Sequence, residues 1–215
     1  MDPMSQNYYI TTPIYYVNDK PHIGHAYTTL ACDVLARFKT LDGYDVTFLT
    51  GTDEHGQKVE KAAEAAGLTP QCFTDQVSQN FRDLTKGMNF ANNDFIRTTE
   101  DRHKAACQKI WSILRENGHI TLGKYEGWYS VRDETFFTET ELVDGVAPTG
   151  ATVEWVEEPS YFFNLSAWQD RLLDFYEKNP RFVGPESRFN EVKSFVKGGL
   201  HDLSVSRASF NWGVP

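Results

Sequence analysis

The 215-residue sequence has few cysteines. Cys32, Cys72 and Cys107 are its only three, and no two of them form a Cys-x-x-Cys pair. Pairs at that spacing are typical of structural zinc sites, and larger even sets are typical of disulfide frameworks. We therefore expect three free, buried or half-buried thiols in a protein of a reducing compartment.

Positive charge and long apolar runs are also scarce. The 21 Lys and Arg residues are outnumbered by 30 Asp and Glu, for a net charge of -9, so the chain lacks the basic surplus of a nucleic-acid-binding surface. No apolar run is long enough to span a membrane, and residues 1–7 are polar and acidic, unlike a signal peptide. We expect a cytoplasmic protein with no membrane partner.

What the first half does contain is an alternation of strand and helix patterns, which predicts an α/β fold with right-handed crossovers and a parallel sheet. Strands are predicted over 8–12, 14–17, 45–50 and 94–98, and helices over 23–43, 58–66, 69–86 and 100–117. The first helix has apolar residues every three or four positions, which predicts that they line one face of an amphipathic helix. These residues are Ile23, Tyr27, Leu30, Val34, Phe38 and Leu41.

The second half changes character. Short alternating runs broken by Gly and Pro over 120–159 predict a small β-rich insertion, with one helical turn at 139–143. Ser166 is expected to cap a helix that ends at Asn179, and a further helix is expected over 190–196. Residues 202–207 alternate like a strand, which we expect to return to the first sheet.

Two polar stretches, 18–25 and 51–56, each follow a predicted strand. Because ligands bind beyond the carboxyl ends of parallel strands, both stretches are expected at one rim of the sheet. The first stretch also begins a helix, where unpaired backbone N–H groups and the helix dipole favour a phosphate. The sequence therefore predicts a phosphate site here.

His22 and His25 lie three residues apart at this helix start, so they can reach one ligand group. As donors they could hold a phosphate whose charge grows in a transition state. Gly24 between them costs about 1 kcal/mol relative to Ala in a helix, which a flat purine against the backbone would explain. Two alternatives stay open: histidines without function, and a zinc set of His22, His25, Asp53 and His55, although a helix N-terminus disfavours a cation.

Several motifs together closely resemble the amino-terminal half of the methionyl-tRNA synthetase family of class I aminoacyl-tRNA synthetases. They are Pro-Ile-Tyr-Tyr-Val-Asn at 13–18, His-Ile-Gly-His at 22–25 and Gly-Thr-Asp-Glu-His-Gly at 51–56. The resemblance continues through Tyr-Glu-Gly-Trp-Tyr at 125–129 and Ser-Val-Ser-Arg at 204–207. His-Ile-Gly-His alone would fit any class I synthetase or a related nucleotidyltransferase. The preceding and following motifs narrow the resemblance to the synthetases of one amino acid, methionine.

The resemblance implies a Rossmann-like nucleotide-binding parallel sheet interrupted by a β-rich connective insertion. The implied segments are a first catalytic half over 1–118, the insertion with flanking helices over 119–200, and a truncated return strand over 201–215. It also implies a methionine–tRNA ligase: methionine and ATP with Mg²⁺ give methionyl-adenylate, and the methionyl group passes to tRNA. Contact with tRNA is expected mainly through parts of the enzyme outside this sequence.

The family's roles transfer to matching positions. The ATP-binding positions would be Asn18, His22, Gly24 and His25, with the two histidines stabilising charge at the α-phosphate. The methionine-binding positions would be Pro13, Ile14, Tyr16, Asp53 and His55. Arg207 would face the cleft. An ammonium group needs an acidic partner and a thioether needs an apolar, polarizable wall, so these residue types suit their roles. For Asp53 the alternative is a helix N-cap.

The sequence departs from the family in two respects. Where many members hold zinc with Cys-x-x-Cys knuckles, residues 130–133 read Ser-Val-Arg-Asp, so we expect a zinc-free knuckle held by aromatic packing of Trp128, Tyr129, Phe136 and Phe137. The sequence also lacks the Lys-Met-Ser-Lys-Ser type loop that would clamp the triphosphate. We expect a fragment that is inactive alone. The alternatives are a truncated, non-catalytic relative that binds ATP, methionine or a partner, and a small-molecule nucleotidyltransferase.

Overall fold

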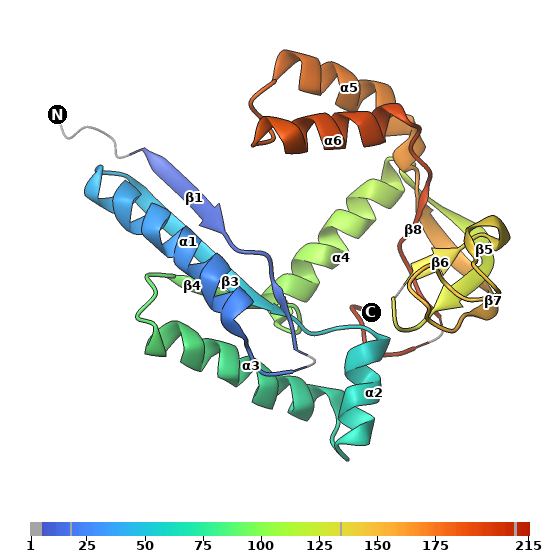
Figure 1. The fold of residues 1–215 in the computed structure, drawn as a ribbon, viewed down its shortest axis with the longest axis horizontal. Helices are drawn as coiled ribbons and strands as arrows, with labels where there is room; N and C mark the ends of the chain where they lie inside the picture. The colour runs from blue at the N-terminus through green and yellow to red at the C-terminus, as the bar shows by residue number, and fades with distance from the viewer. Residues whose placement is uncertain (1–5, 18, 134, 209) are drawn as a thin grey trace. The chain divides into compact units, whose positions relative to one another are not determined.

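The computed structural model describes residues 6–215 except 18, 134 and 209 (Figure 1). It forms two compact units, one of residues up to 108 together with 210–215, and one of residues 109–209. Their limits differ from the segments 1–118, 119–200 and 201–215, which rest on the family resemblance and stay predictions. In the part of the chain that is described, no helix is both long enough and apolar enough to cross a membrane.

The first unit is built on a four-stranded parallel sheet, as predicted. Its strands are β1 (Asn7–Thr11), β2 (Tyr15–Tyr16), β3 (Asp45–Asp53) and β4 (Asp94–Arg97). The central strand is β3, which pairs with β1 and then β2 along one side and with β4 along the other. All strands therefore end at the same edge.

The helices of this unit begin and end where local sequence signals predict. They are α1 (Ile23–Leu41), α2 (Gln57–Ala65), α3 (Pro70–Gly87) and α4 (Asp101–Glu116), the last of which continues into the second unit. Thr69 caps α3 by accepting a hydrogen bond from the Cys72 N–H, with Pro70 at the first helical position. Gly43 and Gly67 follow α1 and α2 with positive φ, which glycine adopts at no steric cost.

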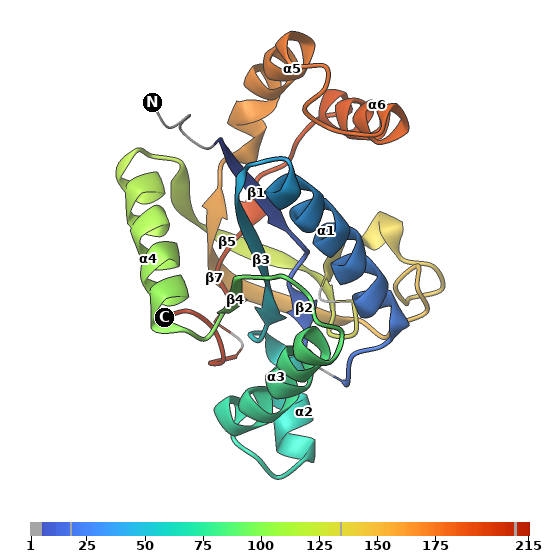
Figure 2. The same cartoon turned by 90° about the vertical axis from the view of Figure 1, so that its left-hand side faces the viewer.

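The apolar face of α1 is exposed in this structure. Ile23, Tyr27 and Leu41 are 88%, 74% and 89% exposed, and Leu30, Val34 and Phe38 are exposed as well. The helix, which runs along β1 and β3 (Figure 2), instead buries Thr29, Asp33 and Ala36. Periodicity shows that a helix has an apolar side but does not show which side faces the sheet, and here small and hydrogen-bonded side chains do.

The core of the first unit lies among β2, α2, α3 and β4. Tyr15, Val17, Val59, Phe81 and Phe95 form it, and Trp212 from the end of the chain packs against it. Residues that are distant in the sequence, from Tyr15 to Trp212, therefore stabilise the same cluster.

The second unit is built on an antiparallel sheet in the order β6-β5-β7-β8, which confirms the β-rich insertion. Its strands are β5 (Ile120–Ser130), β6 (Thr135–Phe137), β7 (Glu154–Phe163) and β8 (Leu203–Ser204). Its helices are α5 (Gln169–Lys178) and α6 (Glu186–Lys197), with 3₁₀ turns η1 (Glu139–Glu141) and η2 (Leu165–Trp168). The turn predicted at 139–143 is η1.

The stretch 130–133, where the family resemblance places a zinc knuckle, is held by side-chain hydrogen bonds. The Asp133 carboxylate accepts from the hydroxyls of Ser130 at 2.8 Å and Thr149 at 2.6 Å. The predicted aromatic packing lies beside it: the rings of Tyr129 and Phe136 are 4.6 Å apart between centroids, and Trp128 packs edge-on against Trp155.

Three predictions are wrong. Ser166 does not cap α5; it lies inside η2, and its hydroxyl donates to Asp202 Oδ1 at 2.6 Å. The strand β8 pairs antiparallel with β7 and not with the first sheet, because alternation predicts a strand without naming its partner. Cys72 is exposed, since it lies in the solvent-facing first turn of α3, whereas Cys32 and Cys107 are half-buried.

The contact between β3 and β4 generates a stability prediction. A Cβ atom at Gly51 would lie 2.0 Å from the Ile96 carbonyl oxygen, a backbone atom held in the sheet. We expect Gly51→Ala to lower the free energy of unfolding by about 3 kcal/mol, at the upper end of the cost of overpacking. Urea unfolding followed by circular dichroism measures this.

Gly87→Ala is the matched control, because a Cβ there meets nothing within 4 Å and its φ is helical. It should be neutral or stabilise by up to about 1 kcal/mol. Equal unfolding midpoints for the two variants would contradict the prediction.

Candidate active site

The carboxyl ends of β2 and β3 bring the two polar stretches together. Tyr16 lies opposite Asp53, and Tyr15 lies opposite Thr52, in the parallel register of these strands. Parallel strands end at one edge, so residues that follow β2 and residues that follow β3 share a rim. The placement predicted for the two stretches is therefore found.

The two histidines cap α1. The Nδ1 atom of His22 accepts from the Gly24 N–H at 3.1 Å, and the Nδ1 atom of His25 accepts from the His22 N–H at 3.0 Å. A neutral imidazole that accepts at Nδ1 carries its proton on Nε2. Each ring thus combines a helix-capping acceptor with an Nε2–H donor.

His25 is further constrained by three rings around it. Its centroid lies 3.9 Å from that of His22, 4.7 Å from that of Tyr15 and 5.2 Å from that of Phe81. Burial among these rings lowers the pKa of His25, and the neighbouring His22 lowers it further. His25 is therefore a neutral donor near pH 7, because an unperturbed histidine already titrates at about 6.5.

The structure explains why residue 24 is a glycine, which the sequence alone did not. A Cβ atom there would lie 2.9 Å from Cε1 and 3.1 Å from Nδ1 of His22, closer than side-chain atoms normally approach. The His22 ring folds back over Gly24 to cap the helix. The glycine is thus explained by this contact without a flat ligand against the backbone.

Asp53 and His55 flank the buried Glu54 at the end of β3, and both are half-buried. The His55 ring packs edge-on against Trp212, with centroids 5.4 Å apart. Burial lowers the pKa of His55, and the positive charge of Lys104 adds to the effect.

A pocket of about 480 Å³ opens at the α1 end of the rim, and it contains four of the predicted site residues. It is lined by Ile14, Tyr15, Tyr16, Asp19, Lys20, His22 and His25. Pro13, Asp53 and His55 do not line this pocket. Tyr15, Asp19 and Lys20 were not predicted as site residues, although the aromatic strand end and the turn before α1 pointed to their positions.

The remaining two predicted residues are Asn18 and Arg207. Asn18 lies outside the described residues. Arg207 belongs to the second unit, where its guanidinium donates to the Ser204 hydroxyl at 2.7 Å and lies 5.5 Å from the Phe136 ring centroid. Its place in a cleft stays a prediction.

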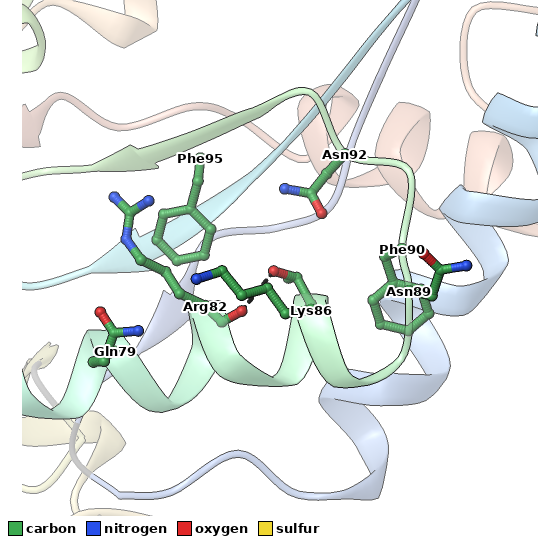
Figure 3. Close-up of a pocket in the computed structure, with 8 residues that line it drawn as sticks. Gln79, Arg82, Lys86, Asn89, Phe90, Asn92 and Phe95 are labelled. Atoms are coloured by element: carbon green, nitrogen blue, oxygen red, sulfur yellow. Dashed lines mark hydrogen bonds between the residues drawn. The ribbon is translucent and has the colours of Figure 1, made fainter.

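A second pocket, of about 490 Å³, lies between α3 and β4 and contains no predicted site residue (Figure 3). Arg82 lies over the ring of Phe95, with 4.2 Å from its guanidinium carbon to the ring centroid. The stacking on Phe95 therefore explains the basic side chain of Arg82 in this pocket without a bound ligand.

Among the residues described here, no three His, Cys, Asp or Glu side chains gather as metal ligands would. The alternative zinc set of His22, His25, Asp53 and His55 is thus not assembled in this structure. The expectation of a zinc-free insertion stays a prediction.

Comparison with known proteins bears on the same residues. The sequence matches the protein-family model described as tRNA synthetases class I (M) over residues 8–152 and 140–215. It is 68% identical over 212 residues to the methionine–tRNA ligase of Rickettsia conorii and 58% identical over 215 residues to that of Mesorhizobium japonicum. Each alignment covers 98% of this chain and 42% of the relative.

A solved structure shows the same fold. The chain superposes on Mycobacterium tuberculosis methionyl-tRNA synthetase in complex with methionyl-adenylate with a TM-score of 0.92 and 52% identity. The match covers 97% of this chain and 42% of that protein, so the chain spans about two-fifths of the length of the relatives it matches. On the family match, which extends over nearly all of its length, the chain belongs to the methionyl, class I family of tRNA synthetases.

Proposed function

We propose that this chain forms the amino-terminal part of a methionine–tRNA ligase and supplies one side of the site that makes methionyl-adenylate. The observation that supports this most strongly is the shared rim, where the histidine-capped start of α1 lies beside the Tyr16–Asp53 pair. A phosphate donor site and an amino-acid site must adjoin for a carboxylate to reach a phosphorus atom.

The ATP side of the site consists of Asn18, His22, Gly24 and His25. The Nε2–H groups of the two histidines donate to oxygens of the α-phosphate, and the start of α1 adds its dipole. Because capping fixes both rings before the ligand arrives, little reorganisation is needed when charge develops. Mg²⁺ enters with ATP as part of the substrate.

The methionine side consists of Pro13, Ile14, Tyr16, Asp53 and His55. Asp53 pairs with the substrate ammonium, and the other four provide an apolar, polarizable wall for the thioether. The lowered pKa of His55 suits this role, because a neutral ring does not repel the ammonium. Arg207 is proposed as a further cleft residue.

In the reaction, a methionine carboxylate oxygen attacks the α-phosphorus of ATP, a P–O bond forms, and the bond to pyrophosphate breaks. The histidine donors stabilise the negative charge on the α-phosphate oxygens during attack. A hydroxyl at the end of tRNA then attacks the methionyl carbonyl and AMP leaves. Contacts to tRNA come mainly from parts of the enzyme that the longer relatives carry.

The exposed side of α1 supports the view that a further part belongs on this unit. Ile23, Tyr27, Val34 and Leu41 are each more than half exposed on this one helix. Within the described residues β1 pairs on one side only, with β3, so its other edge is open. The relatives are more than twice as long as this chain, and their additional length is the natural cover.

The acidic partner of methionine can be tested on this chain. Asp53→Asn should weaken methionine binding, measured by isothermal titration calorimetry, about 10- to 100-fold, since hydrogen bonds to charged groups contribute about 1.5–3 kcal/mol. Asp42→Asn, which removes a carboxylate beyond the end of α1, is the matched control and should bind as the native chain does. Unchanged affinity in Asp53→Asn would assign the ammonium to another group.

The isolated chain should catalyse little methionine-dependent exchange of pyrophosphate into ATP. Without a loop that clamps the triphosphate it loses several kcal/mol of transition-state stabilisation, and each ~1.4 kcal/mol is tenfold in rate. The Rickettsia conorii ligase, assayed alongside, provides the reference rate. Exchange near that rate by the isolated chain would refute the prediction, and exchange supported by leucine or valine in place of methionine would refute the amino-acid assignment.

His25→Ala in an active enzyme that contains this sequence should lower turnover much more than it weakens methionine binding. Removing one donor of this type costs about 100- to 1,000-fold in turnover. His201→Ala, an exposed histidine of the second unit, is the control. Equal losses in turnover and methionine affinity would show that His25 acts in ground-state binding.

A further inference from the structure

Glu54, between the two predicted methionine-site residues Asp53 and His55, has a fully buried carboxylate. Its Oε1 accepts from the Thr52 hydroxyl at 2.6 Å and from Arg97 Nε at 2.7 Å. Its Oε2 accepts from Arg97 Nη2 at 2.9 Å and from the Thr99 hydroxyl at 2.5 Å. Four donors therefore hold the two oxygens, and Arg97 binds both of them at once.

The backbone of Glu54 is held as firmly as its side chain. Its N–H donates to the Thr98 hydroxyl at 2.9 Å, and its carbonyl accepts from the Trp212 indole N–H. Trp212 also accepts a hydrogen bond at its own carbonyl from the Gly56 N–H at 3.0 Å. The segment from Glu54 to Gly56 is thus tied to β4 on one side and to the end of the chain on the other.

The two predicted methionine-site residues are attached directly to this fixed residue. Asp53 is the last residue of β3 and directly precedes Glu54. His55 directly follows Glu54, and its ring packs against Trp212. Arg97 has a second partner in Asp75 of α3, at 2.7 Å, so the guanidinium is held from both sides. A rotation of the Glu54 backbone would move both site residues together.

A gain in stability alone does not explain why the Glu54 carboxylate and the Arg97 guanidinium are buried together. Burying a carboxylate and a guanidinium carries a desolvation penalty that can exceed their attraction, and an apolar set of the same volume is often as stable. What a fully bonded buried pair does provide is a single geometry for the residues attached to it.

We infer that Glu54, held by Arg97, Thr99 and Trp212, is a positioning residue that sets the geometry of Asp53 and His55 for the substrate amino acid. This inference rests on the proposed function, because it assigns the two neighbours to methionine. Glu54 itself is too buried to touch a ligand, so its effect must pass through them.

The test compares two buried carboxylates. Glu54→Gln keeps the shape of the side chain but replaces one acceptor oxygen with a donor, which faces the guanidinium or the Thr99 hydroxyl. Asp33→Asn makes the same chemical change at a buried carboxylate on α1, bonded to Arg37 and to the Ala91 N–H. Each variant is made in this chain, with its unfolding midpoint measured to confirm that it is folded at the temperature of the assay.

Two readouts separate positioning from stability. The first is the affinity for methionine, measured by calorimetry. It should fall about tenfold or more in Glu54→Gln, which is the contribution of one charge-assisted hydrogen bond, and it should stay unchanged in Asp33→Asn. The second is the NMR signals of the His55 ring, assigned with His55→Gln, which should move in Glu54→Gln without ligand and stay in place in Asp33→Asn. Thr99→Val, which removes a single donor, should give smaller changes of the same kind.

The outcomes are distinct. Native methionine affinity and native His55 signals in Glu54→Gln would overturn the inference, as would equal losses in both carboxylate variants. If the native chain fails to bind methionine, the proposed function of this chain fails, and the His55 signals alone then decide whether Glu54 positions its neighbour. If Glu54→Gln does not fold, Thr99→Val decides by the same two readouts.

Discussion

In a parallel sheet every strand ends at the same edge, and in this chain that alignment brings together the residues of the candidate site. The pairing of β2 with β3 sets Tyr16 opposite Asp53, although the two residues are far apart in the sequence. The loop after β2 then leads directly into the histidine-capped start of α1. Without this alignment the proposed phosphate site and the acidic Asp53 would be two unrelated surface features.

The groups at this rim are fixed by hydrogen bonds made within the protein. Both histidines use Nδ1 to cap α1, which sets their tautomer and ring orientation, and burial keeps His25 neutral by lowering its pKa. On the other side, Glu54 is bonded at both carboxylate oxygens and at both backbone groups. Donors and acceptors that are already oriented need little reorganisation when a substrate charge arrives, which is the usual source of electrostatic stabilisation.

Much of this could be predicted from the sequence, because the determining signals are local. Thr69-Pro70 marks the start of α3, glycines mark the ends of α1 and α2, and the strand patterns give the parallel sheet. The His-Ile-Gly-His and Gly-Thr-Asp-Glu-His-Gly motifs give the family, which the family match confirms. The roles assigned to individual site residues remain predictions.

What could not be predicted depends on contacts between distant residues. The period of α1 reveals an apolar side but not that this side is exposed, with Ile23 and Leu41 nearly uncovered. The alternation over 202–207 reveals a strand but not that β7 is its partner. Glu54 and Trp212 are 158 residues apart, and no local pattern links them. The hydrogen bond from the Trp212 indole N–H to the Glu54 carbonyl is therefore visible only in the fold.

The most direct test of the central claim, that one rim holds both ATP and methionine, is the affinity of this chain for a stable analogue of methionyl-adenylate, measured by calorimetry. The analogue occupies both sides of the proposed site at once. If they adjoin, it should bind at least about tenfold more tightly than methionine alone, since ~1.4 kcal/mol of added contact suffices for that factor. An analogue that binds no more tightly than methionine would contradict a joint site.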